Sequence, residues 1–163
     1  DNKCGRRYDG EYDHKYSYSR IGYNLKASDF QAAVGVAQMA RLQGFINKRV
    51  ENWTYLRENL DGLPIQFVEA SANSRPSWFG FAFLTADRNK LARYLDSKGV
   101  GNRPIMGGNL LRQTAYKNID CRVIGNLSGA DTIHEQGIWI GVYPGIDDEM
   151  RKYQVQTIRG FYG

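Results

Sequence analysis

Cysteines and long apolar runs are scarce in this sequence of 163 residues, and each scarcity argues against a class of protein. No apolar run approaches the ~18 residues that a membrane-spanning helix needs, so we expect no membrane partner. The first residues are charged and lack the apolar stretch of a signal peptide. Cys4 and Cys121 are the only cysteines, too few for a disulfide framework. We therefore predict a cytoplasmic protein and, because the chain does not begin with Met, a fragment of a longer one.

Basic residues exceed acidic ones and give a formal net charge of +5, but no segment concentrates them. They occur as pairs, such as Arg6-Arg7 and Lys48-Arg49, whereas nucleic-acid-binding proteins usually collect positive charge on one face. We therefore expect no nucleic-acid partner. A phosphorylated small molecule would need far fewer cations, and the eleven tyrosines favour an interface or a binding pocket.

The chain divides into an irregular segment, 1–26, and one predicted domain, 27–163. Ser28 and Asp29 offer N-capping oxygens before a long amphipathic segment, in which Gly44 is expected to kink the helix or divide it in two. The periodicity predicts helices at 30–63, 87–99, 128–136 and 147–163, and strands at 65–70, 77–85, 100–105 and 137–142.

This order of elements predicts an α/β fold in which helices pack on a small mixed or antiparallel sheet, led by the long helix. The apolar residues of the predicted strands 77–85 and 137–142 are expected to lie in the core, because both strands are rich in aromatic and β-branched side chains. The predicted core residues are Phe79, Phe81, Trp139 and Ile140.

The first candidate binding motif is "GYNLK", residues 22–26, which leads into the long helix. Gly22 lets the backbone turn, the amide of Asn24 can donate to an oxyanion, and Lys26 adds a positive charge. These groups suit a phosphate, but a loop that merely caps the following helix is an equally good interpretation.

The second candidate is Arg103 together with "GGNLLRQ", residues 107–113. The glycines allow close approach to the backbone, and Asn109, Arg112 and Gln113 carry groups that hydrogen-bond sugar or phosphate oxygens. The segment is not a phosphate-binding loop of the GxxxxGK[ST] type, so nucleotide hydrolysis is not predicted. A structural turn remains open for it.

The remaining chemistry-bearing residues form no recognisable catalytic set. Cys4 lies among basic residues that favour its thiolate, which suits metal ligation or redox chemistry, yet one cysteine makes no metal site. His14 is interpreted as a surface or interface histidine and His134 as structural. From the residues alone, the chain is predicted to bind a phosphorylated small molecule, and no catalytic chemistry is apparent.

Five segments resemble the C-terminal portion of the DegT/DnrJ/EryC1/StrS aminotransferase family and occur in its order: "CGRRYD", "YDHKYSYSRIGYNLKASDFQAAVGVAQ", "SWFGF", "GNLLRQ" and "WIGVYPG". The second segment is long and specific, and the resemblance covers nearly the whole chain. It implies the C-terminal small domain of the aspartate-aminotransferase (type I) fold.

Within this family the chain resembles the CDP-4-keto-6-deoxyglucose-3-dehydrases. The resemblance implies an enzyme that uses pyridoxamine or pyridoxal 5′-phosphate to remove the C3 hydroxyl of a CDP-linked 4-keto-6-deoxyhexose, in deoxysugar biosynthesis of the O-antigen type. It also implies a homodimer and a partner reductase that delivers electrons through a [2Fe-2S] cluster. The catalytic base is then a histidine in an upstream domain, so the isolated chain is expected to be inactive. A nucleotide-sugar aminotransferase of the same family and a non-catalytic phosphate- or sugar-binding fragment are the alternatives.

The resemblance also implies roles for individual residues. Asn24 matches an asparagine that reaches the cofactor phosphate of the other subunit, with Lys26 as its companion, and Cys4 matches the last cysteine of the cluster motif. The segment "SGAD", residues 128–131, departs from the usual family residues and is expected to affect sugar preference. The implied substrate contacts are His14, Arg103, Asn109 and Arg112.

Overall fold

The computed structural model describes residues 21–23 and 25–163. Cys4, His14 and Asn24, three of the predicted site residues, therefore lie outside the described residues. The chain divides into two units, Asp1–Ala40 and Arg41–Gly163. The sheet, the core and the candidate substrate segment all belong to the second unit. The domain boundary expected after residue 26 stays a prediction.

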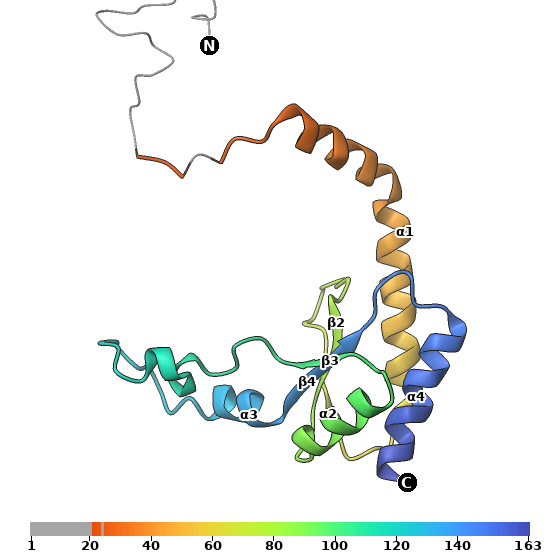
Figure 1. The fold of residues 1–163 in the computed structure, drawn as a ribbon, viewed down its shortest axis with the longest axis vertical. Coiled ribbons are helices and arrows are strands. Elements are labelled where there is room, and N and C mark those ends of the chain that lie inside the picture. The colour runs from red at the N-terminus through yellow and green to blue at the C-terminus, as the bar shows by residue number, and fades with distance from the viewer. Residues whose placement is uncertain (1–20, 24) are drawn as a thin grey trace, which may run out of the picture. The chain divides into compact units, whose positions relative to one another are not determined.

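The described elements follow the predicted order closely. The sequence predicts a strand over 65–70, but only Gln66 and Phe67 form one. The elements are α1 (Asp29–Asn59), β1 (Gln66–Phe67), β2 (Gly80–Leu84), α2 (Arg88–Ser97), β3 (Asn102–Pro104), the 3-10 helices η2 (Leu110–Arg112) and η3 (Thr114–Tyr116), α3 (Ser128–Gln136), β4 (Gly137–Gly141) and α4 (Asp148–Tyr162) (Figure 1).

Helix α1 begins where the capping signal places it. The Gln31 amide N–H donates to Ser28 Oγ at 3.4 Å, while the Ser28 N–H donates to Gln31 Oε1 at 2.9 Å, so the two residues cap the helix start reciprocally. The helix then runs without a break across Gly44, so the division expected there is wrong. Glycine keeps its backbone N–H, and its lower helix propensity costs only about 1 kcal/mol relative to alanine.

The strands form one four-stranded sheet in the order β1-β2-β4-β3. All three neighbouring pairs are antiparallel, which decides between the two sheet types that the sequence left open. In the central pair, Phe81 lies opposite Ile140 and Phe83 opposite Ile138. These four side chains are fully buried and form one face of the sheet.

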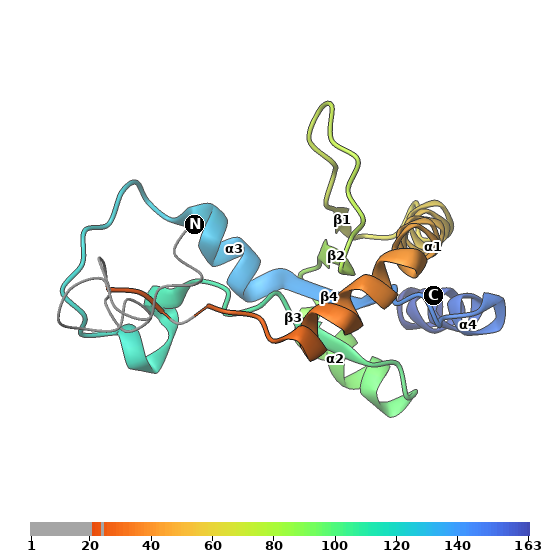
Figure 2. The ribbon, with the colours of Figure 1, turned by 90° about the horizontal axis from the view of Figure 1, so that it is seen from above.

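The buried face of the sheet is covered by the C-terminal part of α1 and by α2 and α4, which contribute further buried apolar residues to the same cluster: Leu56, Leu60, Leu91, Leu95, Val155 and Ile158. The C-terminal part of α1 and helix α4 lie side by side (Figures 1 and 2). Arg151 of α4 pairs with Glu51 of α1. Arg159 donates to the backbone carbonyls of Asn59 and Asp61, at 2.7 and 3.0 Å, and so satisfies oxygens at the end of α1.

The core prediction is right for Phe81 and Ile140 but wrong for Phe79, whose side chain is 64% exposed. A bend at Phe79 takes this residue off the strand, so its ring packs on Trp139 at a centroid distance of 5.1 Å. Trp139 lies on the opposite face from Ile140 because side chains alternate along a strand, and it is only half-buried. Gly80 makes this packing possible, since a Cβ there would lie 2.4 Å from the indole.

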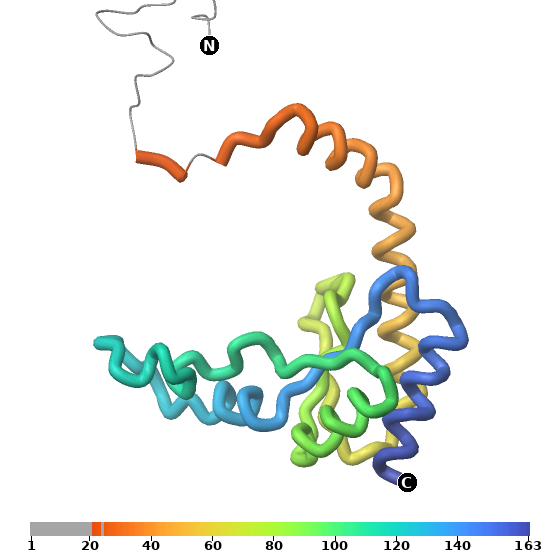
Figure 3. The backbone as a smooth tube through the Cα atoms, in the orientation of Figure 1, coloured from red at the N-terminus to blue at the C-terminus, as the bar shows by residue number. Residues whose placement is uncertain are grey.

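A long connection between β3 and β4, residues 105–136, extends away from the sheet and returns through α3 (Figure 3). We call it the β3–β4 arm. It contains the candidate segment 107–113 and the short helices η2 and η3. Arg88 of α2 fastens its returning end by donating to the carbonyls of His134 and Glu135, at 2.9 and 3.0 Å.

Replacing Asn52 by alanine should destabilise the fold by about 1–3 kcal/mol, because two backbone carbonyls of the turn after β4 would lose the donor that a buried side chain gives them. Asn52 is 1% exposed. Its Nδ2 donates to the carbonyls of Tyr143 at 3.1 Å and Ile146 at 3.5 Å, which fixes the turn after β4 to α1.

Chemical denaturation of the variant and the parent measures this difference in the free energy of unfolding. The matched control is Asn47→Ala on the same helix, where the amide is exposed and a change within about 0.5 kcal/mol is expected. Equal effects of the two substitutions would contradict a structural role for Asn52.

Candidate functional site

The segment 107–113 begins with a tight turn against helix α3. Met106 and Gly108 have φ angles of 44° and 58°, in the left-handed region, which glycine adopts without strain. A Cβ on Gly108 would lie 2.4 Å from His134 Nδ1. The close backbone approach that the sequence predicts at this glycine is therefore an approach to His134 within the same chain.

Asn109 follows this turn and is 5% exposed. Its Nδ2 donates to Asp131 Oδ1 at 2.8 Å, and its Oδ1 accepts from the Leu111 N–H at 3.1 Å, which caps η2. Its backbone N–H donates to His134 Nδ1 at 3.4 Å. Both polar atoms of the Asn109 side chain thus have partners within the protein.

Arg112 binds the same carboxylate from the other side. Its Nε donates to Asp131 Oδ1 at 2.8 Å and its Nη2 to Asp131 Oδ2 at 2.7 Å, a bidentate pair. The Arg112 side chain is 57% exposed, so its remaining nitrogen faces solvent. We call Asn109, Arg112 and Asp131 the Asp131 clamp.

The clamp changes the acidity of Asp131. The hydrogen bonds from Arg112, and after them the one from Asn109, lower the pKa of the Asp131 carboxyl from 3.8 to about 2. The same contact raises the pKa of the Arg112 guanidinium. Both groups therefore stay charged across the whole range in which proteins normally work.

Arg103 lies apart from the clamp, on β3. It is exposed and pairs in register with Trp139, so its side chain emerges on the open face of the sheet. Among the described residues it has no hydrogen-bonded or ion-paired partner. Beside it is a shallow apolar hollow of about 160 Å³, lined by Trp78, Phe79, Gly80, Ala82, Ile105, Met106 and Trp139.

The structure brings together only part of the predicted site. Asn109 and Arg112 meet through Asp131, whereas Arg103 contacts neither of them. Lys26 is exposed and belongs to the other unit, Asp1–Ala40. Asp131 and His134 were not predicted as partners of this segment, because no local spacing connects them with residues so far upstream.

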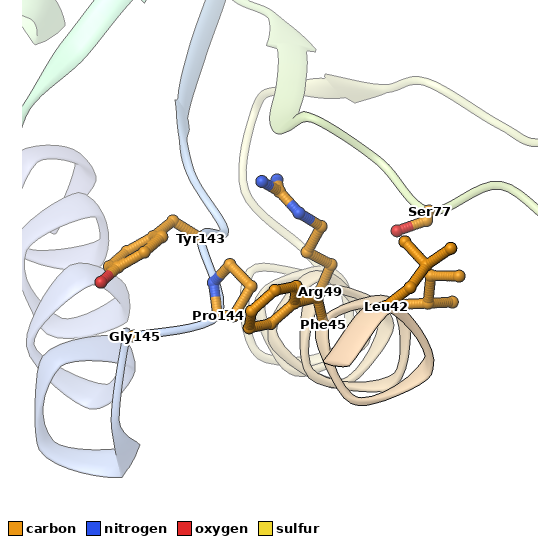
Figure 4. Close-up of a pocket in the computed structure, with 8 residues that line it drawn as sticks. Leu42, Phe45, Arg49, Ser77, Tyr143, Pro144 and Gly145 are labelled. Carbon is orange, nitrogen blue, oxygen red and sulfur yellow. The ribbon is translucent and has the colours of Figure 1, made fainter. Parts of the chain in front are cut away.

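A larger hollow of about 650 Å³ lies between α1 and the turn that follows β4 (Figure 4). It is lined by Leu42, Phe45, Ile46, Arg49, Ser77, Tyr143, Pro144 and Gly145. Arg49 is the one charged residue in this lining, and it already donates to the carbonyls of Trp78 and Phe79, at 3.4 and 3.1 Å. The lining contains no acid–base pair, so it suits an apolar cover rather than a reaction.

The described residues contain no group of three or more His, Cys, Asp or Glu side chains placed to hold a metal ion. Cys121 lies in the β3–β4 arm as an exposed free thiol. Within the described part of the chain, no helix combines the length and the apolar character needed to cross a bilayer.

The stability that Asp131 contributes should disappear in acid. Because its pKa is lower in the folded protein than the ordinary value of 3.8, the carboxylate stabilises the fold above about pH 4. That contribution is lost as the pH falls towards the folded pKa of about 2.

The melting temperatures of the parent and of Asp131→Asn should therefore differ at neutral pH. They should converge as the pH falls from about 4 towards about 2. Asp120→Asn, a substitution at an exposed aspartate of the same arm, should give no such convergence. A gap between parent and Asp131→Asn that is independent of pH would refute the ion pair as its cause.

Two curated relatives match essentially the whole chain. The lipopolysaccharide biosynthesis protein RfbH of Salmonella typhimurium is 40% identical over 177 residues, covering 100% of this chain and 40% of the relative. The dTDP-4-dehydro-2,6-dideoxy-D-glucose 3-dehydratase of Saccharopolyspora spinosa is 40% identical over 174 residues, covering 99% of this chain and 38% of the relative. The chain thus spans about 40% of the length of the curated relatives that it matches.

Solved structures share its fold. A DegT DnrJ EryC1 StrS aminotransferase from Brucella abortus superposes with a TM-score of 0.80 at 23% identity, over 99% of this chain and 42% of that one. An E. coli GDP-4-keto-6-deoxy-D-mannose-3-dehydratase with bound hydrated PLP gives a TM-score of 0.78 at 25% identity, over 96% of this chain and 41% of that one. The predicted fold class, an α/β domain of the aspartate-aminotransferase (type I) fold, is confirmed.

The family model for these enzymes matches residues 2–159. The match includes the long leading helix, all four strands of the sheet and the β3–β4 arm with its clamp. This chain therefore belongs to the DegT/DnrJ/EryC1/StrS aminotransferase family.

Proposed function

We propose that this chain is the C-terminal part of a pyridoxamine- or pyridoxal-phosphate-dependent dehydratase that removes the C3 hydroxyl of a nucleotide-linked 4-keto-6-deoxyhexose. The observation that carries the proposal is the 40% identity, along 99% of the chain, to a protein named as a nucleotide-sugar 3-dehydratase. The product would enter deoxysugar biosynthesis. Similarity to a lipopolysaccharide biosynthesis protein along the whole chain supports this role.

The cofactor phosphate would be bound by the segment that leads into α1. Lys26 is exposed and has no ion-paired partner among the described residues, so its ammonium group is available to an anion. Asn24 is proposed to donate to the same phosphate, reaching it from the other subunit of a homodimer. When bound, the cofactor supplies the electron sink for the reaction, while the protein positions it and the sugar.

Arg103 is proposed to bind the diphosphate of the sugar nucleotide. A guanidinium group on an open sheet face, without a partner among the described residues, is suited to a phosphate because it presents several donors in a fixed geometry. A ligand bound over the neighbouring aromatic side chains would be shielded from water on one side, which would strengthen this attraction. His14 is proposed as a further substrate contact, and the nucleotide is proposed to be CDP.

An iron–sulfur cluster would distinguish this enzyme from its aminotransferase relatives. We assign Cys4 as one ligand, with further cysteines preceding Asp1 in the full-length protein, because a [2Fe-2S] cluster needs four ligands. A partner reductase would deliver the electrons. An aminotransferase of the same family is the alternative, and the fold does not separate the two because both share it. It would carry a lysine base upstream and would not need Cys4.

The reaction product decides between these two functions. We expect the full-length protein, supplied with pyridoxamine phosphate, a reductant and CDP-4-keto-6-deoxyglucose, to release a sugar that lacks the C3 oxygen. Mass spectrometry of the product measures this loss. An amino sugar formed at the expense of glutamate would instead establish the aminotransferase.

The cluster assignment has its own test. Cys4→Ser in the full-length protein should abolish the visible absorption of a [2Fe-2S] cluster, because the substitution removes one of its thiolate ligands. Cys121→Ser, which removes the exposed free thiol of the arm, should leave that absorption unchanged. A variant Cys4→Ser that keeps the full absorption would show that another residue completes the cluster.

A further inference from the structure

The β3–β4 arm holds its shape without an apolar core of its own. Among residues 105–136, the one buried residue is Asn109, a polar one. The large apolar side chains of the arm are exposed instead: Met106 at 73%, Leu110 at 55%, Ile119 at 52%, Val123 at 51% and Ile124 at 73%. Among the described residues, hydrophobic burial therefore contributes little to the conformation of the arm, and polar contacts carry most of it.

Those polar contacts join the outgoing and the returning halves of the arm at one carboxylate. Asn109 and Arg112 lie on the outgoing half, and Asp131 lies in α3 on the returning half. Helix α3 is in turn fastened to the core, since Arg88 of α2 donates to the carbonyls at its end. The chain of contacts runs from α2 through α3 to the segment 107–113.

The Asp131 clamp occupies the polar groups of Asn109 and Arg112, the two residues of this segment that the family resemblance assigns to the substrate. The Asn109 side chain has partners for both of its polar atoms, and the Arg112 guanidinium uses two nitrogens for Asp131. Neither residue can turn fully to a ligand without giving up its own hydrogen bonds to Asp131. An ion pair that is this exposed makes only a modest contribution to global stability, so its main effect is on the local conformation of the arm.

We propose that Asp131 is a positioning residue, which holds Asn109 and Arg112, and through them the segment 107–113, in the shape that receives the nucleotide sugar. Asn109 and Arg112 then serve the shape of the segment, and Arg103 remains free to contact the diphosphate. This inference rests on the proposed function, because it takes the nucleotide sugar as the ligand of the segment.

The test uses the full-length enzyme with Asp131→Asn. The asparagine side chain has the size of aspartate but no charge. It can place an amide N–H, a donor, where Arg112 needs an acceptor, so the bidentate pair is lost. Hydrogen exchange at the Leu111 amide, which donates to Asn109 Oδ1, should accelerate about tenfold or more. Exchange at the amides of β4 should stay unchanged.

Kinetics of the same variant should show a specific pattern. We expect the KM for the nucleotide sugar to rise about tenfold, with kcat within about twofold and with unchanged cofactor absorbance, because ligand binding alone is impaired. Asp131→Glu, which restores a carboxylate, should recover part of the affinity. Asp120→Asn is the matched control and should behave like the parent in every measurement.

A double-mutant cycle separates positioning from direct contact. If Arg112 acts through Asp131, then Arg112→Gln combined with Asp131→Asn should raise KM no further than either substitution alone. Additive effects would overturn the proposal, because Arg112 would then contact the sugar nucleotide itself. Unchanged exchange at Leu111 in Asp131→Asn would overturn it as well. A parent enzyme that accepts no nucleotide sugar would refute the proposed function, while the exchange measurement would still decide whether Asp131 holds the segment.

Discussion

Burial of a single face of the antiparallel sheet is the constraint on which the other features of this structure depend. Phe81, Phe83, Ile138 and Ile140 point to that face and are fully buried beneath three helices. Each such side chain contributes about 1.5–3 kcal/mol relative to its exposed state. Trp139 and Arg103 emerge on the opposite face, where Arg103 is exposed and Trp139 is only half-buried.

The β3–β4 arm follows a different principle from the core that carries it. Its order depends on a charged cluster at Asp131 and on hydrogen bonds to the end of α3, whereas the core depends on apolar contacts. Hydrogen bonds and ion pairs are directional, so they fix the orientation of a segment more sharply than apolar burial does. Their small net energy also lets such a segment move more readily than the core. Both properties fit the proposed role of segment 107–113 in receiving a ligand.

The relatives place these features in a longer protein. The chain aligns along its whole length with two curated relatives, yet it covers only about 40% of RfbH. Apolar side chains are exposed on the arm and around the hollow of Figure 4, where a further protein surface could cover them. The activity proposed above is therefore one of a full-length enzyme.

Local signals allowed most of the fold to be predicted. Capping at Ser28 and amphipathic periodicity located the four α-helices but not the short 3-10 helices η2 and η3, because capping and amphipathic spacing act between residues close in sequence and a single 3-10 turn is too short to show a period. The prediction failed at Phe79, since an aromatic residue next to a strand suggests burial whether or not the backbone bends before the strand begins. It also failed at Gly44, because propensity alone does not decide whether a helix continues.

The sequence by itself determined the order of the elements, the family and the segments that carry polar binding groups. Only the tertiary structure decided which face of the sheet is buried and what the residues of segment 107–113 contact. Asn109 and Arg112 meet Asp131 across 22 and 19 positions of the chain. No local pattern encodes such a contact, because it depends on where the arm turns back and on how α3 is fastened to the core.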